Sequence, residues 1–125
     1  MPRQPRVLIV DDDENIVSAF EEFLAKERCT VVTASGAEEA FAIITHTTVN
    51  LVITDIRMRW QSGVTLLMKI KQLNSKLPVI VITGYPSLVS EADVRHYGGE
   101  YFFVKPLEID QLRNAVRDCL SRNSM

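Results

Sequence analysis

Cysteine is scarce in this 125-residue chain, and neither sign of charge dominates it. The two cysteines, Cys29 and Cys119, lie far apart inside apolar-periodic stretches, so we expect buried thiols in a reducing compartment, with neither a disulfide nor a zinc site. The chain has 14 basic and 16 acidic residues and a formal net charge of −2. This balance argues against a nucleic-acid-binding surface and against a basic membrane anchor.

Long hydrophobic runs are also missing. Near the N-terminus only the four apolar residues 7–10 precede three aspartates, which is too short for a signal peptide or a membrane span, so we expect a cytoplasmic protein. No linker, repeat or low-complexity stretch interrupts the sequence. A chain of this length is expected to form one domain over residues 1–125 and to bury enough surface to fold without a disulfide or a structural metal.

The chain does contain five short, mostly apolar runs that alternate with longer helical periodicities. The runs are rich in β-branched residues and show little polar alternation; they span residues 7–10, 30–33, 51–54, 79–82 and 101–104. Strands of this kind are buried on both faces, which predicts a parallel sheet covered by helices on each side. The expected fold class is therefore α/β, with β–α repeated five times.

The segments between the runs carry helix signals. Residues of about 14–27 have an apolar stripe on one face, and Asp13 is interpreted as the N-cap of this helix in preference to a metal ligand. Ser35 and Glu38 fit a capping box at the start of the next helix.

A later helix is expected over residues of about 87–97. Pro86 suits its first turn, and Gly98-Gly99 is expected to end it.

Polar side chains follow four of the five predicted strands. The carboxyl ends of parallel strands meet at one edge of a sheet, where open α/β folds bind their ligands. The second strand ends in residues that offer only a helix cap. The side chains after the other four are Asp11, Asp12 and Asp13, then Asp55, then Thr83, and finally Lys105.

This collection of side chains predicts a metal-assisted phosphoryl site. The carboxylates of Asp11, Asp12 and Asp55 repel one another and require a compensating cation. The candidate ligands are hard oxygens and no His or Cys cluster exists in the sequence, so Mg²⁺ is expected, with Mn²⁺ as the alternative. Lys105 and Thr83 would offer an ammonium and a hydroxyl to a phosphoryl group, and an aspartate beside them could accept it as an aspartyl phosphate.

These motifs resemble the receiver domain of bacterial two-component response regulators over essentially the whole chain. The matching segments are residues 10–13, residues 53–58 around Asp55, Thr83-Gly84 and Lys105-Pro106, in the order and spacing of the family. The resemblance implies a flavodoxin-like (βα)5 fold, doubly wound, whose five-stranded parallel sheet has the strand order 2-1-3-4-5. It also implies a phosphoacceptor signalling domain that catalyses only its own phosphorylation and dephosphorylation, and is not otherwise an enzyme.

The resemblance implies a role for each acidic residue. Asp55 would accept a phosphoryl group from a phosphohistidine on a sensor histidine kinase or a phosphotransfer protein. Asp12, Asp55 and the backbone carbonyl of Arg57 would coordinate Mg²⁺, and Asp11 would help through water.

The remaining motif residues would read the phosphorylated state. Thr83 and Lys105 would each bind an oxygen of the phosphoryl group, and Phe102 would be the aromatic switch. The family usually has a cis bond before the proline, so Lys105–Pro106 is expected to be cis. The output would appear on the face of the fourth helix, fifth strand and fifth helix, which carries Tyr97, Tyr101 and Phe102. Homodimerisation on phosphorylation and transcriptional control are candidate outcomes, without contact of this domain to nucleic acid or membrane.

The chain departs from the family in the loop after Asp55. Where proline is usual, this sequence has Arg59, followed by Trp60. A cation there would modulate donor access or phosphoryl lifetime; a solvated arginine without a role is the equal alternative. Arg57 and Tyr85 are further candidate modulators. Trp60, the single tryptophan, is expected near the metal, with fluorescence that changes when Mg²⁺ binds.

Two other functions fit part of the pattern. Haloacid-dehalogenase-like phosphatases have Asp-x-Asp after the first strand, which residues 11–13 satisfy, but they usually carry Thr or Val where this chain has Asn15, and they need a cap or a longer chain. A flavodoxin-like cofactor binder would need a glycine- or hydroxyl-rich phosphate loop, whereas the aspartates here would repel a phosphate.

Overall fold

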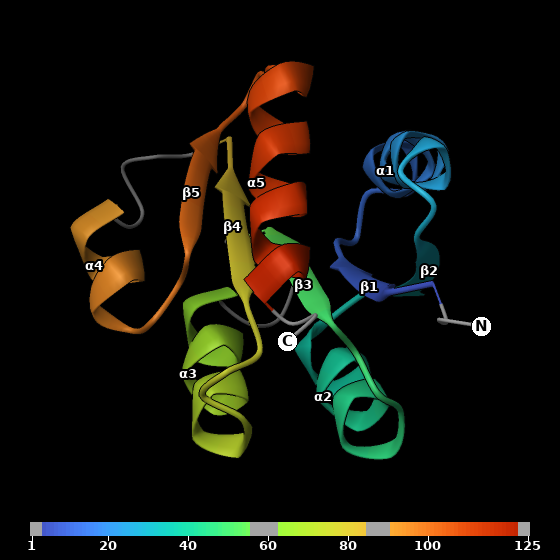
Figure 1. The fold of residues 1–125 in the computed structure, drawn as a ribbon. Coiled ribbons are helices and arrows are strands. Elements are labelled where there is room, and N and C mark those ends of the chain that lie inside the picture. The colour runs from blue at the N-terminus through green and yellow to red at the C-terminus, as the bar shows by residue number, and fades with distance from the viewer. Residues whose placement is uncertain (1–3, 56–62, 85–90, 123–125) are drawn as a thin grey trace.

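The computed structural model describes residues 4–55, 63–84 and 91–122, and strands and helices alternate along them (Figure 1). In chain order the elements are β1 (Arg6–Val10), α1 (Glu14–Lys26), β2 (Thr30–Ala34), α2 (Ala37–His46), β3 (Leu51–Asp55), α3 (Gly63–Leu73), β4 (Val79–Thr83), α4 (Glu91–His96), β5 (Tyr101–Val104) and α5 (Ile109–Arg122).

The five strands form one parallel sheet in the order β2-β1-β3-β4-β5. The predicted α/β class, parallel sheet and strand order are confirmed. The chain runs outward from β1 to β2 and then crosses back to β3, so the winding reverses between β1 and β3. In open sheets of this kind, that reversal leaves a crevice beyond the carboxyl ends of the two strands.

Helices cover both faces of the sheet, and the alternation of side chains along β1 shows how. Leu8 and Val10 belong to one buried cluster that includes residues of α2, α3 and α4. Val7 and Ile9 belong to a second cluster with residues of α1 and α5. Burying one such side chain stabilises the fold by about 1.5–3 kcal/mol, so the central strands form a rigid base for the residues at their ends.

The two cysteines lie where the apolar periodicity predicted them. Cys29 and Cys119 are both buried and unoxidised, and both belong to the cluster beneath α1 and α5. Burial raises the pKa of the Cys29 thiol, and the negative charge of Glu27 adds to the effect. Both residues therefore behave as small core side chains.

One predicted helix start is confirmed and one is wrong. Asp13 caps α1, because its Oδ1 accepts a hydrogen bond of 2.9 Å from the backbone N–H of Asn15. At α2, the N-cap is Gly36 and not Ser35. The helix starts one residue later than predicted, so Glu39 takes the position expected for Glu38. Its Oε2 accepts from the backbone N–H and the hydroxyl of Ser35, at 3.2 and 3.1 Å.

The end of α4 matches the prediction from the two glycines. Gly98 has φ +98°, and the backbone N–H groups of Gly98 and Gly99 donate to the carbonyls of Arg95 and Val94. This pairing satisfies carbonyls at the helix end and favours glycine at the left-handed position. The predicted start near residue 87 and the role of Pro86 lie outside the described residues.

A mostly buried ion pair connects α3 to the segment between α4 and β5. Lys71 Nζ lies 3.1 Å from both carboxylate oxygens of Glu100 and 2.7 Å from the carbonyl oxygen of Leu77. Glu100 also accepts a 2.8 Å hydrogen bond from the backbone N–H of Val79. The two charged side chains are only 12% and 19% exposed. They join the starts of β4 and β5 at the edge opposite the predicted site.

Among the residues that the structure describes, no helix combines the length and apolar character needed to cross a bilayer.

Candidate functional site

The strand order brings the predicted residues to one edge of the sheet. Asp55 is the last residue of β3 and pairs in register with Ile82, directly before Thr83 at the end of β4. Asp55 and Thr83 are buried, at 6% and 0% exposure. One residue beyond β5, the backbone N–H of Lys105 donates to the Thr83 carbonyl over 2.8 Å. Asp55, Thr83 and Lys105 thus lie at the carboxyl ends of three adjacent strands.

Asp55 and Lys105 form a direct ion pair. Lys105 Nζ lies 2.8 Å from Asp55 Oδ2, and the side chains are 28% and 8% exposed. Burial alone would lower the pKa of Lys105, but the hydrogen bond and charge of Asp55, with the charges of Asp11 and Asp13, outweigh it and raise the pKa. The lysine is therefore a fixed cation beside the carboxylate. The peptide bond between Lys105 and Pro106 is cis, as predicted.

Asp11 directly follows β1, the strand next to β3, and is 4% exposed. Its Oδ1 accepts a 2.9 Å hydrogen bond from the backbone N–H of Asp13. Its Oδ2 is buried and has no hydrogen-bond partner within the described ranges. Burial raises the pKa of Asp11 to about 6; the charges of Asp55 and Asp12 add to the rise, while the Asp13 hydrogen bond and Lys105 oppose it. A buried carboxylate oxygen without a partner is a position that a cation would stabilise.

The carboxylates at this edge of the sheet suit a hard divalent cation, but they do not form a complete coordination shell by themselves. Asp11 and Asp55 are buried and close enough for their charges to interact, whereas Asp12 is exposed at the start of the following loop. Among the described residues, no three His, Cys, Asp or Glu side chains converge into a complete metal cluster. Carboxylates would thus supply part of a coordination shell for Mg²⁺, which commonly completes it with water and carbonyl oxygens.

The aromatic residues of β5 point to opposite faces of the sheet. Phe102 is half-buried and packs against the cluster on the α4 side. Tyr101 packs on the α5 side, where its hydroxyl donates to Asp118 Oδ2 over 2.7 Å and its ring stacks with Phe103 at 6.0 Å. The three residues predicted for the output face therefore divide: Phe102 and the 38%-exposed Tyr97 lie toward α4, while Tyr101 contacts α5.

Four of the residues that the sequence analysis placed at or beside the site fall outside the described ranges. They are Arg57, Arg59, Trp60 and Tyr85. Their predicted roles beside the metal and at the mouth of the site stay predictions.

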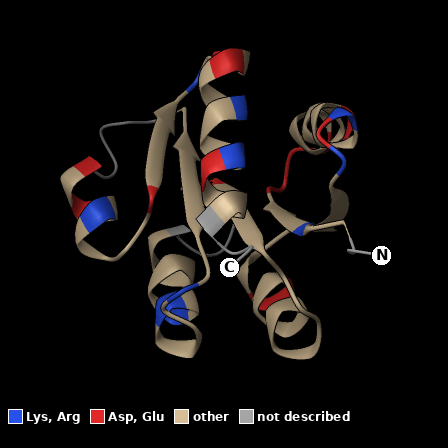
Figure 2. Ribbon diagram, in the orientation of Figure 1, with Lys and Arg blue, Asp and Glu red and all other residues tan. Residues whose placement is uncertain are grey.

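Sequence reasoning missed an acidic hollow of about 400 Å³ beside the site. It lies between α1, the end of β2 and the start of α2, and we call it the α1–α2 hollow. Figure 2 shows the acidic loop that leads from β1 into α1. The carboxylates that line the hollow are Asp11, Asp12, Glu14, Glu21 and Glu39.

Its remaining lining is partly apolar, with Val17 and Ala34, and partly hydroxylic. A usable signal was the spacing of Glu14, Ser18 and Glu21, which places them on one helix face. The role of Glu39 depends on the packing of α2 against the sheet, which no local pattern reveals.

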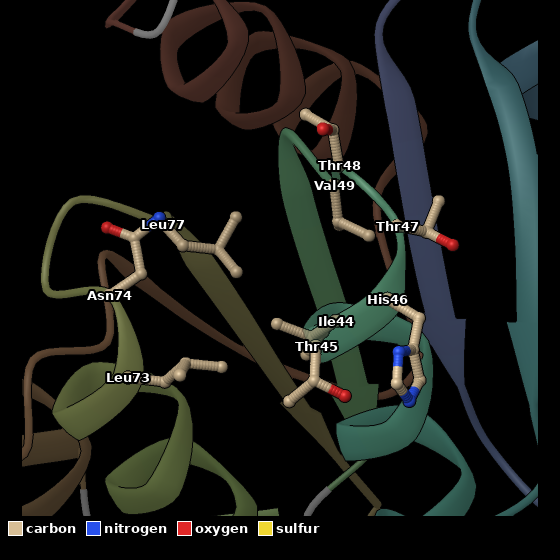
Figure 3. Close-up of a pocket in the computed structure, with 9 residues that line it drawn as sticks. All are labelled: Ile44, Thr45, His46, Thr47, Thr48, Val49, Leu73, Asn74 and Leu77. Atoms are coloured by element: carbon tan, nitrogen blue, oxygen red, sulfur yellow. The ribbon is translucent and has the colours of Figure 1, made fainter.

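A second hollow, of about 460 Å³, lies at the opposite edge of the sheet. The ends of α2 and α3 and the segments that follow them form its walls, with Ile44, Val49 and Leu77 beside Thr45 and His46 (Figure 3). It contains none of the predicted site residues, and its described lining has no carboxylate. It is therefore separate from the acidic edge.

Comparison with known proteins supports the family resemblance that the sequence motifs indicated. The sequence family described as "Response regulator receiver domain" matches residues 7–117. Transcriptional regulatory protein GlrR of Escherichia coli is 30% identical over 118 residues, which is 94% of this chain and 27% of that protein. Sporulation initiation phosphotransferase F of Bacillus subtilis is 29% identical over 119 residues, 95% of this chain and 96% of that protein.

A solved structure has the same architecture. The response regulator protein TrrA of Thermotoga maritima, in complex with Mg(2+)-BeF, is 29% identical, with a TM-score of 0.85 over 94% of this chain and 100% of that one. The chain spans about a quarter of the length of the curated transcriptional regulators it matches. The fold, the convergence of acids and lysine at one sheet edge, and the family match over most of the chain agree, and the chain therefore belongs to the family of response regulator receiver domains of two-component systems.

Proposed function

We propose that this chain is a phosphoacceptor switch that receives a phosphoryl group on Asp55 from the phosphohistidine of a sensor histidine kinase or a phosphotransfer protein. The observation that carries the proposal is the 2.8 Å contact between Asp55 and Lys105 at the ends of β3 and β5. The buried Oδ2 of Asp11, which directly follows β1, also supports the proposal. A buried carboxylate beside a fixed cation can act as a nucleophile toward phosphorus and keep the product charge balanced.

The transfer step exchanges one bond for another. An oxygen of the Asp55 carboxylate attacks phosphorus, and the bond between phosphorus and the donor imidazole nitrogen breaks. The nitrogen keeps the electron pair, and Asp55 becomes an aspartyl phosphate. Lys105 then has a phosphoryl oxygen to neutralise, and Thr83 offers a hydroxyl to another. The group adds close to two negative charges, so contacts made only in the modified state can shift the conformational equilibrium.

Asp11, Asp12 and Asp55 would hold Mg²⁺, or Mn²⁺, with the carbonyl of Arg57 and water. When bound, the cation supplies charge neutralisation for the transferred phosphoryl group. Before transfer it would also offset the mutual repulsion of the carboxylates. The similar Thermotoga protein was solved in complex with Mg(2+)-BeF, which supports magnesium binding by this chain as well.

The switch would run from Thr83 and Lys105 to Phe102 and the face made by α4, β5 and α5. That face would control an output partner or domain in the cytoplasm, with homodimerisation as one outcome. Two kinds of relative support two kinds of output. GlrR is named as a transcriptional regulator and is much longer than this chain, whereas the Bacillus phosphotransferase has nearly its length. Residues 1–125 would act as one receiver domain in either setting, with Arg59 and Tyr85 as candidate modulators of phosphoryl lifetime.

The test is to incubate the protein with Mg²⁺ and acetyl phosphate and to measure its intact mass. We expect a gain of one phosphoryl group that is lost in Asp55→Asn. Asp12→Ala should weaken Mg²⁺ binding, measured by calorimetry, while the circular dichroism spectrum stays unchanged. Asp13→Asn is the matched control, because asparagine is also a good N-cap and the same charge is removed nearby.

Labelling that persists in Asp55→Asn at the same level, or repeated turnover of phosphate esters independent of Asp55, would refute the proposal. Unchanged Mg²⁺ affinity in Asp12→Ala would refute the ligand assignment alone.

A further inference from the structure

One buried hydroxyl has no part in the proposed phosphoryl transfer. In the part of the chain that the structure describes, four polar or charged side chains are buried: Asp11, Thr54, Asp55 and Thr83. The proposed function uses three of them. Thr54, at 0% exposure, is the exception, and it directly precedes the phosphoacceptor in β3. Burying a hydroxyl costs free energy unless it forms a hydrogen bond, so its partner indicates what Thr54 does.

The partner is the backbone of Asp55. The hydroxyl of Thr54 donates to the carbonyl oxygen of Asp55 over 3.1 Å. Asp55 is the last residue of β3, so this carbonyl belongs to the peptide unit through which the chain leaves the sheet. Because a peptide unit is planar, a hydrogen bond to its oxygen restrains rotation of the whole unit about the Cα–C bond of Asp55. Backbone angles decide which side-chain rotamers are allowed, so the same bond restricts the positions open to the Asp55 carboxylate.

The neighbouring strands hold Thr54 in place. It pairs in register with Val10 of β1 and with Val81 of β4, the strands on either side of β3 (Figure 1). Both valines belong to the buried cluster beneath α2, α3 and α4, and both are fully buried. Their side chains are apolar and cannot compete for the hydroxyl. A β-branched side chain also has few χ1 rotamers, so the hydroxyl stays directed at the carbonyl of Asp55.

The proposed reaction tolerates little movement of the Asp55 carboxylate. One of its oxygens must reach phosphorus in line with the leaving nitrogen, and a misplacement of about 1 Å can slow a reaction by about a hundredfold. Lys105 Nζ lies 2.8 Å from Asp55 Oδ2, but its side chain is 28% exposed and its four-carbon stem is flexible. The lysine can therefore follow the carboxylate and does not set its position. A restraint from the rigid side of the site must do so.

We propose that Thr54 is a positioning residue for phosphoryl transfer, and that its buried hydroxyl fixes the backbone of Asp55 and so orients the carboxylate toward the phosphoryl donor. This inference rests on the proposed function. Thr54 acts through the carbonyl of Asp55 and contacts neither the donor nor the phosphoryl group. Serine at this position would keep the restraint, whereas valine would remove it.

The first experiment compares two substitutions at this position. Thr54→Val keeps the branched shape and removes the hydroxyl, whereas Thr54→Ser keeps the hydroxyl and removes a methyl group. Intact mass follows labelling of the full chain by acetyl phosphate, at a Mg²⁺ concentration that saturates each variant. We expect Thr54→Val to slow labelling about fivefold to tenfold, the population shift that one hydrogen bond can maintain. Thr54→Ser should be labelled at the wild-type rate.

The matched control makes the same chemical change elsewhere. Thr30→Val removes a hydroxyl at the start of β2, at the opposite edge of the sheet, and should be labelled at the wild-type rate.

Urea unfolding separates positioning from a purely structural role. Thr54→Ser leaves a methyl-sized space in the core and should lower the midpoint of unfolding. In Thr54→Val the added methyl group offsets part of the lost hydrogen bond, so this variant should be the more stable of the two. The less stable variant is thus expected to be labelled normally and the more stable one slowly. Labelling rates that follow the order of stability would overturn the inference.

A spectroscopic measurement tests the contact without the reaction. The ¹³C resonance of the Asp55 carbonyl should move in Thr54→Val and stay in place in Thr54→Ser. An unmoved resonance in Thr54→Val, labelling of that variant at the wild-type rate, or equally slow labelling of Thr30→Val would overturn the inference and leave the proposed function in place. A wild-type protein that takes up no phosphoryl group on Asp55 would refute the proposed function and this inference with it.

Discussion

Replacing Asp11 with asparagine should stabilise the metal-free protein at neutral pH. The wild-type carboxylate is buried, and its pKa is raised from 3.8 to about 6, chiefly by burial and further by the charges of Asp55 and Asp12. Asparagine is nearly the same size, and its carbonyl oxygen can keep the 2.9 Å hydrogen bond from the backbone N–H of Asp13. The substitution therefore removes an unfavourable charge with little change in packing.

The direction in which stability changes with pH follows from proton binding. Between pH of about 4 and about 6, the folded wild-type protein holds a proton on Asp11 that the unfolded chain has released, so its stability falls as pH rises through this range. A shift of this size corresponds to at most about 3 kcal/mol, at about 1.4 kcal/mol per pKa unit. We expect Asp11→Asn to gain about 1–3 kcal/mol at pH of about 8 and almost nothing at pH of about 4.

Urea unfolding, followed by circular dichroism in a chelator across this pH range, would measure the effect. Asp12→Asn, at the exposed neighbouring position, is the control and should gain less. Saturating Mg²⁺ should reverse the order of wild type and Asp11→Asn, because the wild-type carboxylate then has a partner. A gain in stability that is the same at every pH, or a loss at pH of about 8 in chelator, would refute the reasoning.

Two further substitutions test the packing at the other end of the sheet. Glu100→Gln leaves Lys71 without its buried counter-charge and should lower the free energy of unfolding by about 2 kcal/mol, whereas Glu91→Gln, at an exposed pair, should change it by less than about 0.5 kcal/mol. Equal effects in urea unfolding would contradict the burial argument. Gly99→Ala should cost about 2 kcal/mol, because an added Cβ would lie 2.5 Å from a side-chain carbon of Val94. At Gly36 an added Cβ would have no contacting atom within 4 Å, so Gly36→Ala should lower the free energy of unfolding by less than about 1 kcal/mol. Thermal melts that rank the two glycine variants in the opposite order would contradict the steric reasoning.

Much of the fold could be predicted because the relevant signals are local. Buried parallel strands appear as continuous apolar runs, and residues at their ends must share one edge, which is enough to predict that Asp55 and Lys105 lie together. The strand order came from the family resemblance and not from periodicity. The N-cap of α2 was wrong by one residue because Ser35 and Gly36 are both acceptable caps and the local sequence does not choose between them.

Contacts between distant segments could not be predicted in the same way. Lys71 and Glu100 are 29 residues apart, and nothing in either neighbourhood identifies the other. Glu21 and Glu39 face one hollow only because α1 and α2 are positioned on opposite sides of β2 and β1 by the packed core. Such pairs depend on tertiary packing, which one sequence read element by element does not contain.

The backbone hydrogen bond between Lys105 and Thr83 couples the movements of these two residues. The N–H of Lys105 donates to the Thr83 carbonyl over 2.8 Å, so the two residues proposed to hold the phosphoryl group are neighbours on one ladder. A displacement of the backbone at either residue would therefore move the other, through this hydrogen bond and the paired residues of β4 and β5 that precede it. Thr83 and Lys105 would then move toward a phosphoryl group together. A partner protein that stiffens β5 would alter the contacts of both residues with that group.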